Sequence, residues 1–433
     1  MSKQLAYVRT EMLPQLPPPS TSVGVVGWAR ANLFSSWLNA ILSLFSAAVI
    51  LLILAEIIPW VMSPTWAGTS LNQCREILAA ADHNGGACWG VIRERWIQLL
   101  FGFYPPELYW RPILAFVLLA VALAPILFSD KVPAKLLWFS AAYPFIFPWL
   151  LWGGMIWGPV SAALGLVLGF IVYRLVAASF SSLAGVIAGV VMALLWWLVL
   201  SHYATAALGS ILPIGLEPVE SRRFGGFMLS ITIGIVAIAC SLPLGILLAL
   251  GRRSDLMIVK YLCVGFIEFI RGVPLITLLF VASTLLNIFM PPGTNFDIIL
   301  RVLIMVTLFA AAYMAEVIRG GLAALPKGQY EGADSLGLNY WQAQRLVIMP
   351  QALKISIPGI VSTFIGVFKD TTLVSIIGLL DPLGLSNAIR ADANWNGIVW
   401  ELYGFIAVIF FLFCFGMSRY SMYLERKLQT GHR

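Results

Sequence analysis

Charged residues are scarce in this chain of 433 residues. Asp, Glu, Lys and Arg together make up 11% of the sequence, whereas a soluble globular protein has about 25%. Apolar residues make up 60%, so the chain cannot build a water-facing surface of ordinary polarity. The composition therefore excludes a soluble enzyme, a disordered protein and a nucleic-acid binder, and it predicts an integral membrane protein.

Residues that bind metals or carry covalent chemistry are also few. The three histidines are too scattered for a metal cluster, and most of the five cysteines lie inside apolar runs. The chain has no His-Glu-x-x-His or Gly-x-Ser-x-Gly sequence, which argues against an intramembrane protease. It also has no Gly-Lys pair and therefore no Walker A phosphate loop. We expect no catalytic site, no metal and no cofactor on this chain.

Long apolar runs predict an all-α membrane protein with about ten transmembrane helices, because one span needs about 20 apolar residues. The runs cover residues 37–58, 112–128, 135–152, 156–173, 181–200, 226–250, 258–288, 298–318, 355–378 and 398–418. Pro243 and Pro274 lie within runs and predict kinks or breaks. With the N-terminus in the cytoplasm, most loop Lys and Arg fall on the cytoplasmic side, which predicts that both termini are cytoplasmic.

The runs divide the chain into a polar segment and two groups of helices. Segment 1–36 is polar and predicted to be cytoplasmic, and it is expected to be extended or disordered, because it contains three consecutive prolines. Residues 37–200 form an N-terminal extension of about five helices, with a long extracytoplasmic loop at 59–111. Cys74 and Cys88 lie in that loop and would close a short ring in an oxidising compartment. The sequence leaves open whether they form a disulfide or remain two free thiols.

A long polar loop at 319–354 predicts a helix–turn–helix hairpin on the cytoplasmic face. Pro326 suits the first turn of a helix, and Gly337 suits the left-handed residue that ends one. Three side chains spaced three residues apart are expected to share one stripe of this helix: Tyr330, Ala333 and Leu336.

The second helix of the hairpin carries its own signals. Asn339 followed by Gln342 resembles a capping box, and Pro350 is expected to stop or kink the helix. From spacing alone the hairpin has three interpretations: it binds a soluble partner, lies on the lipid surface, or connects two spans.

Ionisable residues inside spans are costly and therefore indicate functional positions. Glu268 and Arg271 lie three apart on one helix face, which fits either a mutual ion pair or a cavity wall that contacts a zwitterionic substrate. Glu316 and Arg319 lie near the end of a span, where a structural role is expected.

Lys369 and Asp370 lie about 21 Å into a span that starts near residue 355, at about 1.5 Å per residue. The helix is locally polar there, because three hydroxyl residues follow: Thr371, Thr372 and Ser375. One interpretation is an ion pair with another helix, or a lysine that reaches to the interface. The other is a substrate contact, since an amino acid carries both a carboxylate and an ammonium group.

The polar loop resembles the EAA loop of ABC-importer permeases, whose pattern is Glu-Ala-Ala, three residues, Gly, nine residues and Ile-x-Leu-Pro. The matching residues are Glu331, Gly332, Ala333, Gly337, Val347, Met349 and Pro350. Gly332 replaces the first Ala and should loosen the short helix by roughly 1 kcal/mol. The exchanges at Val347 and Met349 are mild, because both residues remain apolar.

Flanking motifs extend the resemblance to the polar-amino-acid (histidine/glutamine) permease family over residues 225–425. They begin, in order, at Ser230, Leu242, Glu268, Ala312 and Lys369. The first half, with Tyr104-Pro-Pro-Glu-Leu-Tyr-Trp-Arg-Pro, is similar to the larger permease subunits of general L-amino-acid importers. These include the type that carries glutamate, glutamine, aspartate and asparagine.

The resemblance implies a MetI-like core of five helices, the fold of type I ABC importers, in the bacterial inner membrane. It implies cytoplasmic ABC ATPase subunits that carry ATP and Mg, a periplasmic amino-acid-binding protein, and a second permease subunit. The long first half favours a heterodimer by resemblance, while the sequence leaves open whether the second subunit is identical. The ATPase-coupling residues are then Tyr330, Glu331, Gly332, Ala333, Asp334, Gly337 and Pro350.

The expected function is therefore that of the permease subunit of an ATP-driven amino-acid importer. The alternative is a secondary transporter driven by an ion gradient, which leaves the EAA loop unexplained. The sequence leaves open whether the first-half spans contact substrate or serve only as a scaffold.

Overall fold

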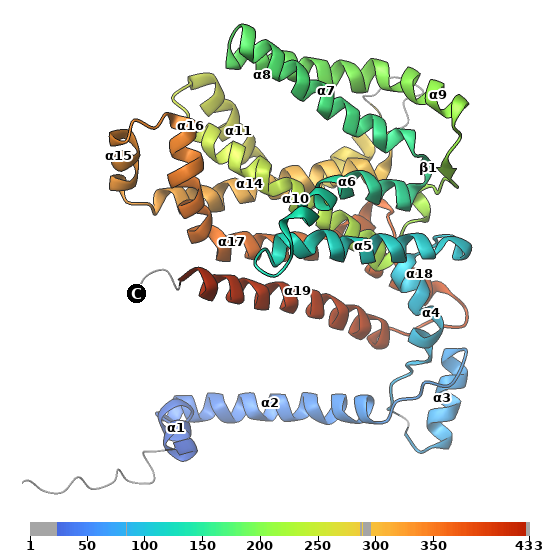
Figure 1. Ribbon diagram of the computed structural model, residues 1–433. Coiled ribbons are helices and arrows are strands. Elements are labelled where there is room, and N and C mark those ends of the chain that lie inside the picture. Colours follow the sequence, from blue (N-terminus) through green and yellow to red (C-terminus); the bar gives the residue numbers. More distant parts are fainter. Residues whose placement is uncertain (1–23, 84, 286–287, 289–295, 430–433) are drawn as a thin grey trace, which may run out of the picture. The chain divides into compact units, whose positions relative to one another are not determined.

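The computed structural model describes residues 24–83, 85–285, 288 and 296–429. Its regular structure is almost entirely helical (Figure 1), which confirms the all-α prediction. In the described part, β1 (Gly154–Met155) and β2 (Gly215–Leu216) form one short antiparallel pair. The chain divides into two compact units, Met1–Gly90 and Val91–Arg433.

Nine helices in the described residues are long and apolar enough to cross a membrane, or ten if one sharply bent pair counts as a span, which confirms the prediction of about ten. The first unit contains α1 (Gly24–Asn32), α2 (Trp37–Met62) and α3 (Leu71–Ala80). α1 shows that the expectation of an extended or disordered segment 1–36 is wrong for residues 24–32, and residues 1–23 lie outside the described residues. The second unit starts with α4 (Gly90–Phe101), α5 (Trp110–Leu127), α6 (Leu137–Trp152), α7 (Trp157–Ser179), α8 (Ser182–Leu195) and α9 (Ser201–Ile211). It continues with α10 (Gly226–Arg252), α11 (Met257–Gly272), α12 (Leu275–Phe280), α14 (Ile298–Ala323), α15 (Lys327–Ser335), α16 (Tyr340–Ala343), α17 (Met349–Asp370), α18 (Pro382–Ala391) and α19 (Trp400–Gln429).

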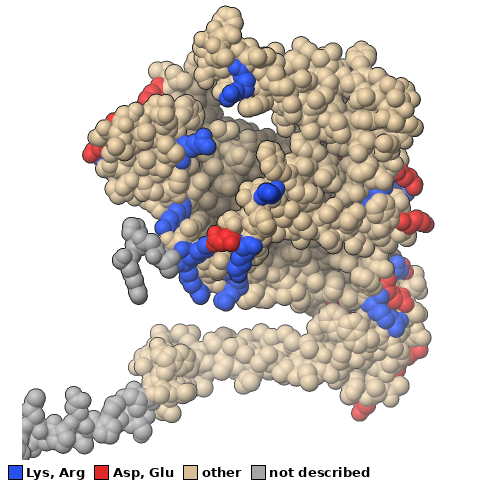
Figure 2. Space-filling model, in the orientation of Figure 1, with Lys and Arg blue, Asp and Glu red and all other residues tan. Residues whose placement is uncertain are grey.

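Short turns of other helix types lie between these elements. Those of 3-10 type are η1 (Pro106–Leu108), η2 (Ala134–Leu136), η4 (Ser221–Arg223) and η7 (Thr371–Ile377). Those of π type are η3 (Trp196–Leu200), η5 (Val281–Leu285) and η6 (Gln344–Ile348). On the face drawn in Figure 2, charged side chains of the second unit gather toward the ends of its long helices, with a mostly uncharged stretch between. Helices that cross an apolar layer distribute their charges in this way.

α2 is apolar all round. None of its residues is buried, and its most apolar window has a mean hydropathy of 2.7. Its start is fixed by Ser36, whose hydroxyl accepts a hydrogen bond from the Asn39 N–H. A helix without a polar face suits a lipid environment.

One hydrophobic cluster joins the extension helices of the second unit to the later helices. Buried residues of α5 and α6, such as Ala115 and Leu151, share this cluster with Ile233 of α10 and Val306 of α14. Because burial of apolar surface is the main favourable term in folding, these helices stabilise one common core.

A buried arginine strengthens the same region. The Arg111 side chain has no exposed surface, and its guanidinium donates to the carbonyls of Leu150 (2.7 Å), Leu151 (3.3 Å) and Glu217 (2.7 Å). The first two lie in the last turn of α6, where carbonyls lack helical partners and a cation is favourable. Sequence reasoning missed this role, because it depends on three segments that only the fold brings together.

α7 and α8 approach closely through facing glycines. A Cβ atom on Gly169 would lie 2.8 Å from the Gly189 carbonyl oxygen, and one on Gly189 would lie 2.7 Å from the Gly169 carbonyl oxygen. Only glycine allows the two backbones to come this near.

Pro274 breaks a long apolar run, as predicted. α11 ends at Gly272, and the axis turns by 102° before the helix that starts at Leu275. Proline has no backbone N–H to donate to a carbonyl of the preceding helical turn, and it disfavours helical geometry in the residue before it. Pro243, in contrast, lies inside α10, which remains one helix, so no break occurs there.

Candidate coupling and translocation site

The polar loop forms a helical hairpin of α15 and α16 (Figure 1). Pro326 stands at the N-cap of α15, one position earlier than expected. At the other end Gly337 has φ +70°, as predicted. Its N–H donates to the Asp334 carbonyl, and the Leu338 N–H donates to the Ala333 carbonyl. This pair of hydrogen bonds is a Schellman motif, which ends α15 sharply.

α16 begins with the predicted capping box. The Asn339 side chain accepts from the Gln342 N–H at 2.9 Å, and the Gln342 side chain accepts from the Asn339 N–H at 3.0 Å. The chain then stays helical through η6 into α17, so a stop at Pro350 does not occur, and the axis bends between α16 and α17 (Figure 1). In η6 the Met349 N–H donates to the Gln344 carbonyl, five residues back, and this wide turn accommodates the proline ring.

The side chains of α15 divide into a packed face and an exposed face. Ala333 is buried and Tyr330 is half-buried. Leu336 lies beyond the end of α15 and is 77% exposed, so the predicted stripe holds only for the other two residues. The remaining predicted coupling residues of this helix are exposed: Glu331, Gly332 and Asp334.

The second half of the hairpin presents apolar side chains to solvent. Tyr340, Trp341 and Leu346 are 52%, 67% and 64% exposed. Together with Arg345 they line an open hollow of about 520 Å³. Large apolar side chains exposed on an otherwise polar loop are typical of a protein-binding surface.

Arg253, which follows the last residue of α10, contacts the hairpin directly. Its guanidinium donates to the Tyr330 hydroxyl at 3.0 Å and lies 5.5 Å from the centre of the tyrosine ring. The Tyr330 hydroxyl in turn donates to the Leu322 carbonyl of α14 at 3.3 Å. Sequence reasoning did not single out Arg253. The sequence feature that could have pointed to Arg253 is the pair of consecutive arginines at the end of an apolar run.

The neighbouring Arg252 holds together a cluster of charges from α10, α11 and α14. Its guanidinium lies 2.8 Å from the Glu268 carboxylate and 2.7 Å from that of Glu316. Glu316 also pairs with Arg319 at 3.0 Å, as their spacing suggests, and lies 3.7 Å from Arg271. Among the described residues, Glu268 and Arg271 pair with other helices and not with each other. Of the two interpretations that the sequence left open for this pair, the mutual ion pair is therefore wrong, because helix packing supplies closer partners.

Lys369 and Asp370 lie in the last turn of α17. Lys369 is exposed and Asp370 is half-buried, and neither makes an ion pair with another described residue. The hydroxyls that follow all donate to carbonyls of their own helix: Thr371 to Phe368, Thr372 to Lys369 and Ser375 to Thr372. The 22 residues of α17 span about 33 Å. Lys369 and Asp370 lie at the C-terminal end of α17 and are therefore far from its N-terminal end, where the hairpin and the cluster of charges around Arg252 lie. The candidate path residues thus form two groups.

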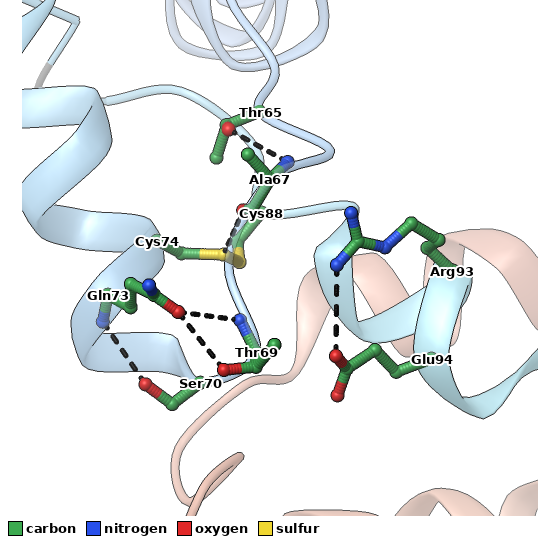
Figure 3. The surroundings of a disulfide bond; sticks show 9 residues. All are labelled: Thr65, Ala67, Thr69, Ser70, Gln73, Cys74, Cys88, Arg93 and Glu94. Atoms are coloured by element: carbon green, nitrogen blue, oxygen red, sulfur yellow. Dashed lines mark hydrogen bonds and ion pairs between the residues drawn. A yellow bond between two sulfur atoms is a disulfide. The ribbon is translucent and has the colours of Figure 1, made fainter.

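Cys74 and Cys88 form a disulfide in the first unit (Figure 3), which is one of the two alternatives that the sequence left open. Their Cα atoms are 5.9 Å apart. Gly68 has φ +103°, and a Cβ atom there would lie 3.1 Å from the Cys74 sulfur, so glycine leaves room for the bridge. The Gln73 side chain accepts hydrogen bonds from the N–H and hydroxyl of Thr69, which fixes the turn that leads into α3.

Comparison with known proteins assigns the family. Residues 241–430 match the family described as binding-protein-dependent transport system inner membrane component. Over 431 residues, 99% of each chain, the sequence is 58% identical to the glutamate/glutamine/aspartate/asparagine transport system permease protein BztC of Rhodobacter capsulatus. The chain belongs to the amino-acid ABC transporter permeases.

The permease is also 40% identical over 422 residues to the inner membrane amino-acid ABC transporter permease protein YhdY of Escherichia coli, covering 96% of this chain and 97% of that one. A chain in the crystal structure of an amino acid ABC transporter with histidines matches 46% of the permease and 91% of its own length, with 30% identity and a TM-score of 0.42. The family match of residues 241–430 and the identity to the relative from Rhodobacter capsulatus confirm the family resemblance of the sequence motifs and the MetI-like second half.

Proposed function

We propose that this permease forms the translocation path of an ATP-driven amino-acid importer and couples to separate ATPase subunits through the α15–α16 hairpin. The observation that carries the proposal is the hairpin itself. Its turn is fixed by the Schellman motif and the capping box, while Glu331, Trp341 and Leu346 remain exposed. A rigid loop with an exposed acidic and apolar surface suits the docking of a soluble protein.

The partners follow from this role. ATP and Mg are assigned to cytoplasmic ABC ATPase subunits that dock on the hairpin. A periplasmic amino-acid-binding protein delivers substrate on the opposite side of the bacterial inner membrane, and a second, different permease subunit completes the pathway. Both termini are then cytoplasmic. The relative from Rhodobacter capsulatus carries glutamate, glutamine, aspartate and asparagine in its name, and we propose the same substrate class here.

Lys369 and Asp370 are the candidate substrate contacts in the path. Lys369 is exposed and Asp370 half-buried at the end of α17, where opposite charges suit the carboxylate and ammonium groups of an amino acid. The neighbouring hydroxyls already bond within their helix, and Thr371 is fully buried. They therefore shape the helix and leave the charged pair to meet the substrate.

Reconstitution in lipid vesicles tests the proposal. The permease is purified with the proteins that accompany it, and uptake of radiolabelled glutamate is measured with ATP on the hairpin side. We expect an ATPase to co-purify and uptake to require ATP and binding protein, with no change when ionophores dissipate ion gradients. Uptake by the permease alone, driven by an ion gradient and independent of ATP, would instead establish a secondary transporter.

A further inference from the structure

The two consecutive arginines at the end of α10 contact different parts of the molecule. Arg252 reaches the carboxylates of Glu268 on α11 and Glu316 on α14. Arg253 reaches Tyr330 on the hairpin helix α15. Adjacent Cα atoms are fixed about 3.8 Å apart, so a displacement of one arginine displaces the other.

The Arg252 side of this pair is partly shielded from water. The side chains of Arg252 and Glu316 are 24% and 16% exposed, so their attraction is stronger than that of a surface ion pair. Glu316 is also held by Arg319 on its own helix. A shift of Arg252 therefore acts on α11 and α14 together.

The Arg253 side is polar and directional. The guanidinium both donates to the Tyr330 hydroxyl and lies over the ring, a geometry that adds a cation–π attraction. The two residues also line a cavity of about 310 Å³, which Leu250 of α10 and Tyr340 and Ile348 of the hairpin region share. Leu250 and Tyr330 also pack against the apolar cluster that contains Ile348, and the Arg253–Tyr330 contact adds a polar connection between the end of α10 and the hairpin.

We propose that Arg252 and Arg253 are positioning residues that transmit displacement of the α15–α16 hairpin to the charge cluster on α11 and α14. Arg253 follows the hairpin through Tyr330, and Arg252 repositions Glu268 and Glu316. The link is anchored in the helix, since the Arg253 N–H donates to the carbonyls of Leu250 and Gly251. The inference rests on the proposed function, in which the hairpin is the element that the ATPase moves.

The test measures coupling in vesicles that contain the complete complex with its ATPase and binding protein. Substrate imported and ATP hydrolysed are counted in the same sample for Arg252→Gln, Arg253→Gln and Tyr330→Phe. The number of substrate molecules imported per ATP should fall by about fivefold or more. Fivefold is the lower end of the effects that couplings between two sites usually produce. Co-purification of the ATPase with the Arg252 and Arg253 variants should stay unchanged. Arg252→Lys and Arg253→Lys should restore most of the ratio, because they keep the charge and a donor. Lys260→Gln, at an exposed cation of α11, is the matched control.

The outcomes separate the inference from the proposed function. If the unaltered complex imports nothing with ATP, the proposed function fails, whatever the variants do. If the unaltered complex works and the glutamine variants import as much per ATP as the Lys260 control, the inference is overturned. If Arg252→Gln or Arg253→Gln releases the ATPase, these arginines serve docking and the proposed link is also overturned.

Discussion

The guanidinium of Arg111 is the donor for three backbone carbonyls inside the second unit. Replacing it with leucine leaves the carbonyls of Leu150 and Glu217 without a donor, at about 1–3 kcal/mol for each buried unsatisfied group, whereas the Leu151 carbonyl keeps the Tyr104 hydroxyl as a donor. We predict that Arg111→Leu lowers the free energy of unfolding by about 2 kcal/mol or more. The thermal unfolding midpoint in detergent measures the effect, with the exposed Arg222→Leu as control. Equal midpoints for the two variants would contradict the structural role.

Asp381 caps α18 from a fully buried position. Its carboxylate accepts hydrogen bonds from the N–H groups of Leu383 (3.1 Å) and Gly384 (2.9 Å). We predict that Asp381→Ala costs about 0.5–2 kcal/mol of stability and that Asp381→Asn retains most of it, because asparagine is an equally good cap. Thermal midpoints of the three proteins at pH 7 test this. A loss of equal size in both variants would show that the cap itself contributes little.

The same carboxylate makes stability depend on pH. Burial raises the pKa of Asp381 to about 6, against the opposing effect of the two backbone hydrogen bonds. A raised pKa means that the folded state binds the proton more tightly, so the associated stability is present at low pH and lost as pH rises through about 6. From pH 7 to pH 5 the wild-type midpoint should therefore rise relative to that of Asp381→Asn. A constant difference would place the pKa of Asp381 outside this window.

At the scale of elements, the sequence predicts what depends on local order. A span follows from about 20 apolar residues, and the turn of the hairpin follows from Gly337, Asn339 and Gln342, because their partners lie within a few residues. The partner of Glu268 does not follow. Arg252 lies on another helix, and only packing decides that it is nearer than Arg271. For the same reason the long-range contacts of Arg111 and Arg253 were missed.

The hairpin offers a prediction about docking. Glu331 is exposed on α15, so its replacement leaves the packing of Ala333 and Tyr330 intact. We predict that Glu331→Lys reduces co-purification of the ATPase and ATP-driven uptake together, by about tenfold or more, because reversal of a charge at an interface costs several kcal/mol. The control is Asp255→Lys, an exposed acidic residue in the turn between α10 and α11. Normal co-purification and uptake by Glu331→Lys would remove this residue from the coupling surface.

At the scale of the molecule, polar contacts join α4 and the end of α5 to later helices of the second unit. Arg95 of α4 lies 2.5 Å from Asp392, beyond α18. The Tyr420 hydroxyl of α19 donates to the Leu127 carbonyl of α5 at 2.6 Å, and Lys427 pairs with Asp130. Each contact is modest alone, yet together with the shared hydrophobic cluster they make α4–α6 part of the permease body.

The first unit is a separate compact unit, and its disulfide allows a direct test of this division. Gly85 is exposed, with no atom within 4 Å of a Cβ built on it, so a protease site inserted after it should not disturb folding. Cleavage there cuts the chain between Cys74 and Cys88. We predict one band on a non-reducing denaturing gel and two after reduction, because the bridge joins the fragments. Separation without reductant would exclude the disulfide.

The reduced, cut protein should keep the main unfolding midpoint of the intact one, since the buried cluster that contains Leu151 and Val306 lies within the second unit. A fall of that midpoint, beyond the shift that reduction causes in the uncut protein, would show that the second unit depends on covalent connection to the first.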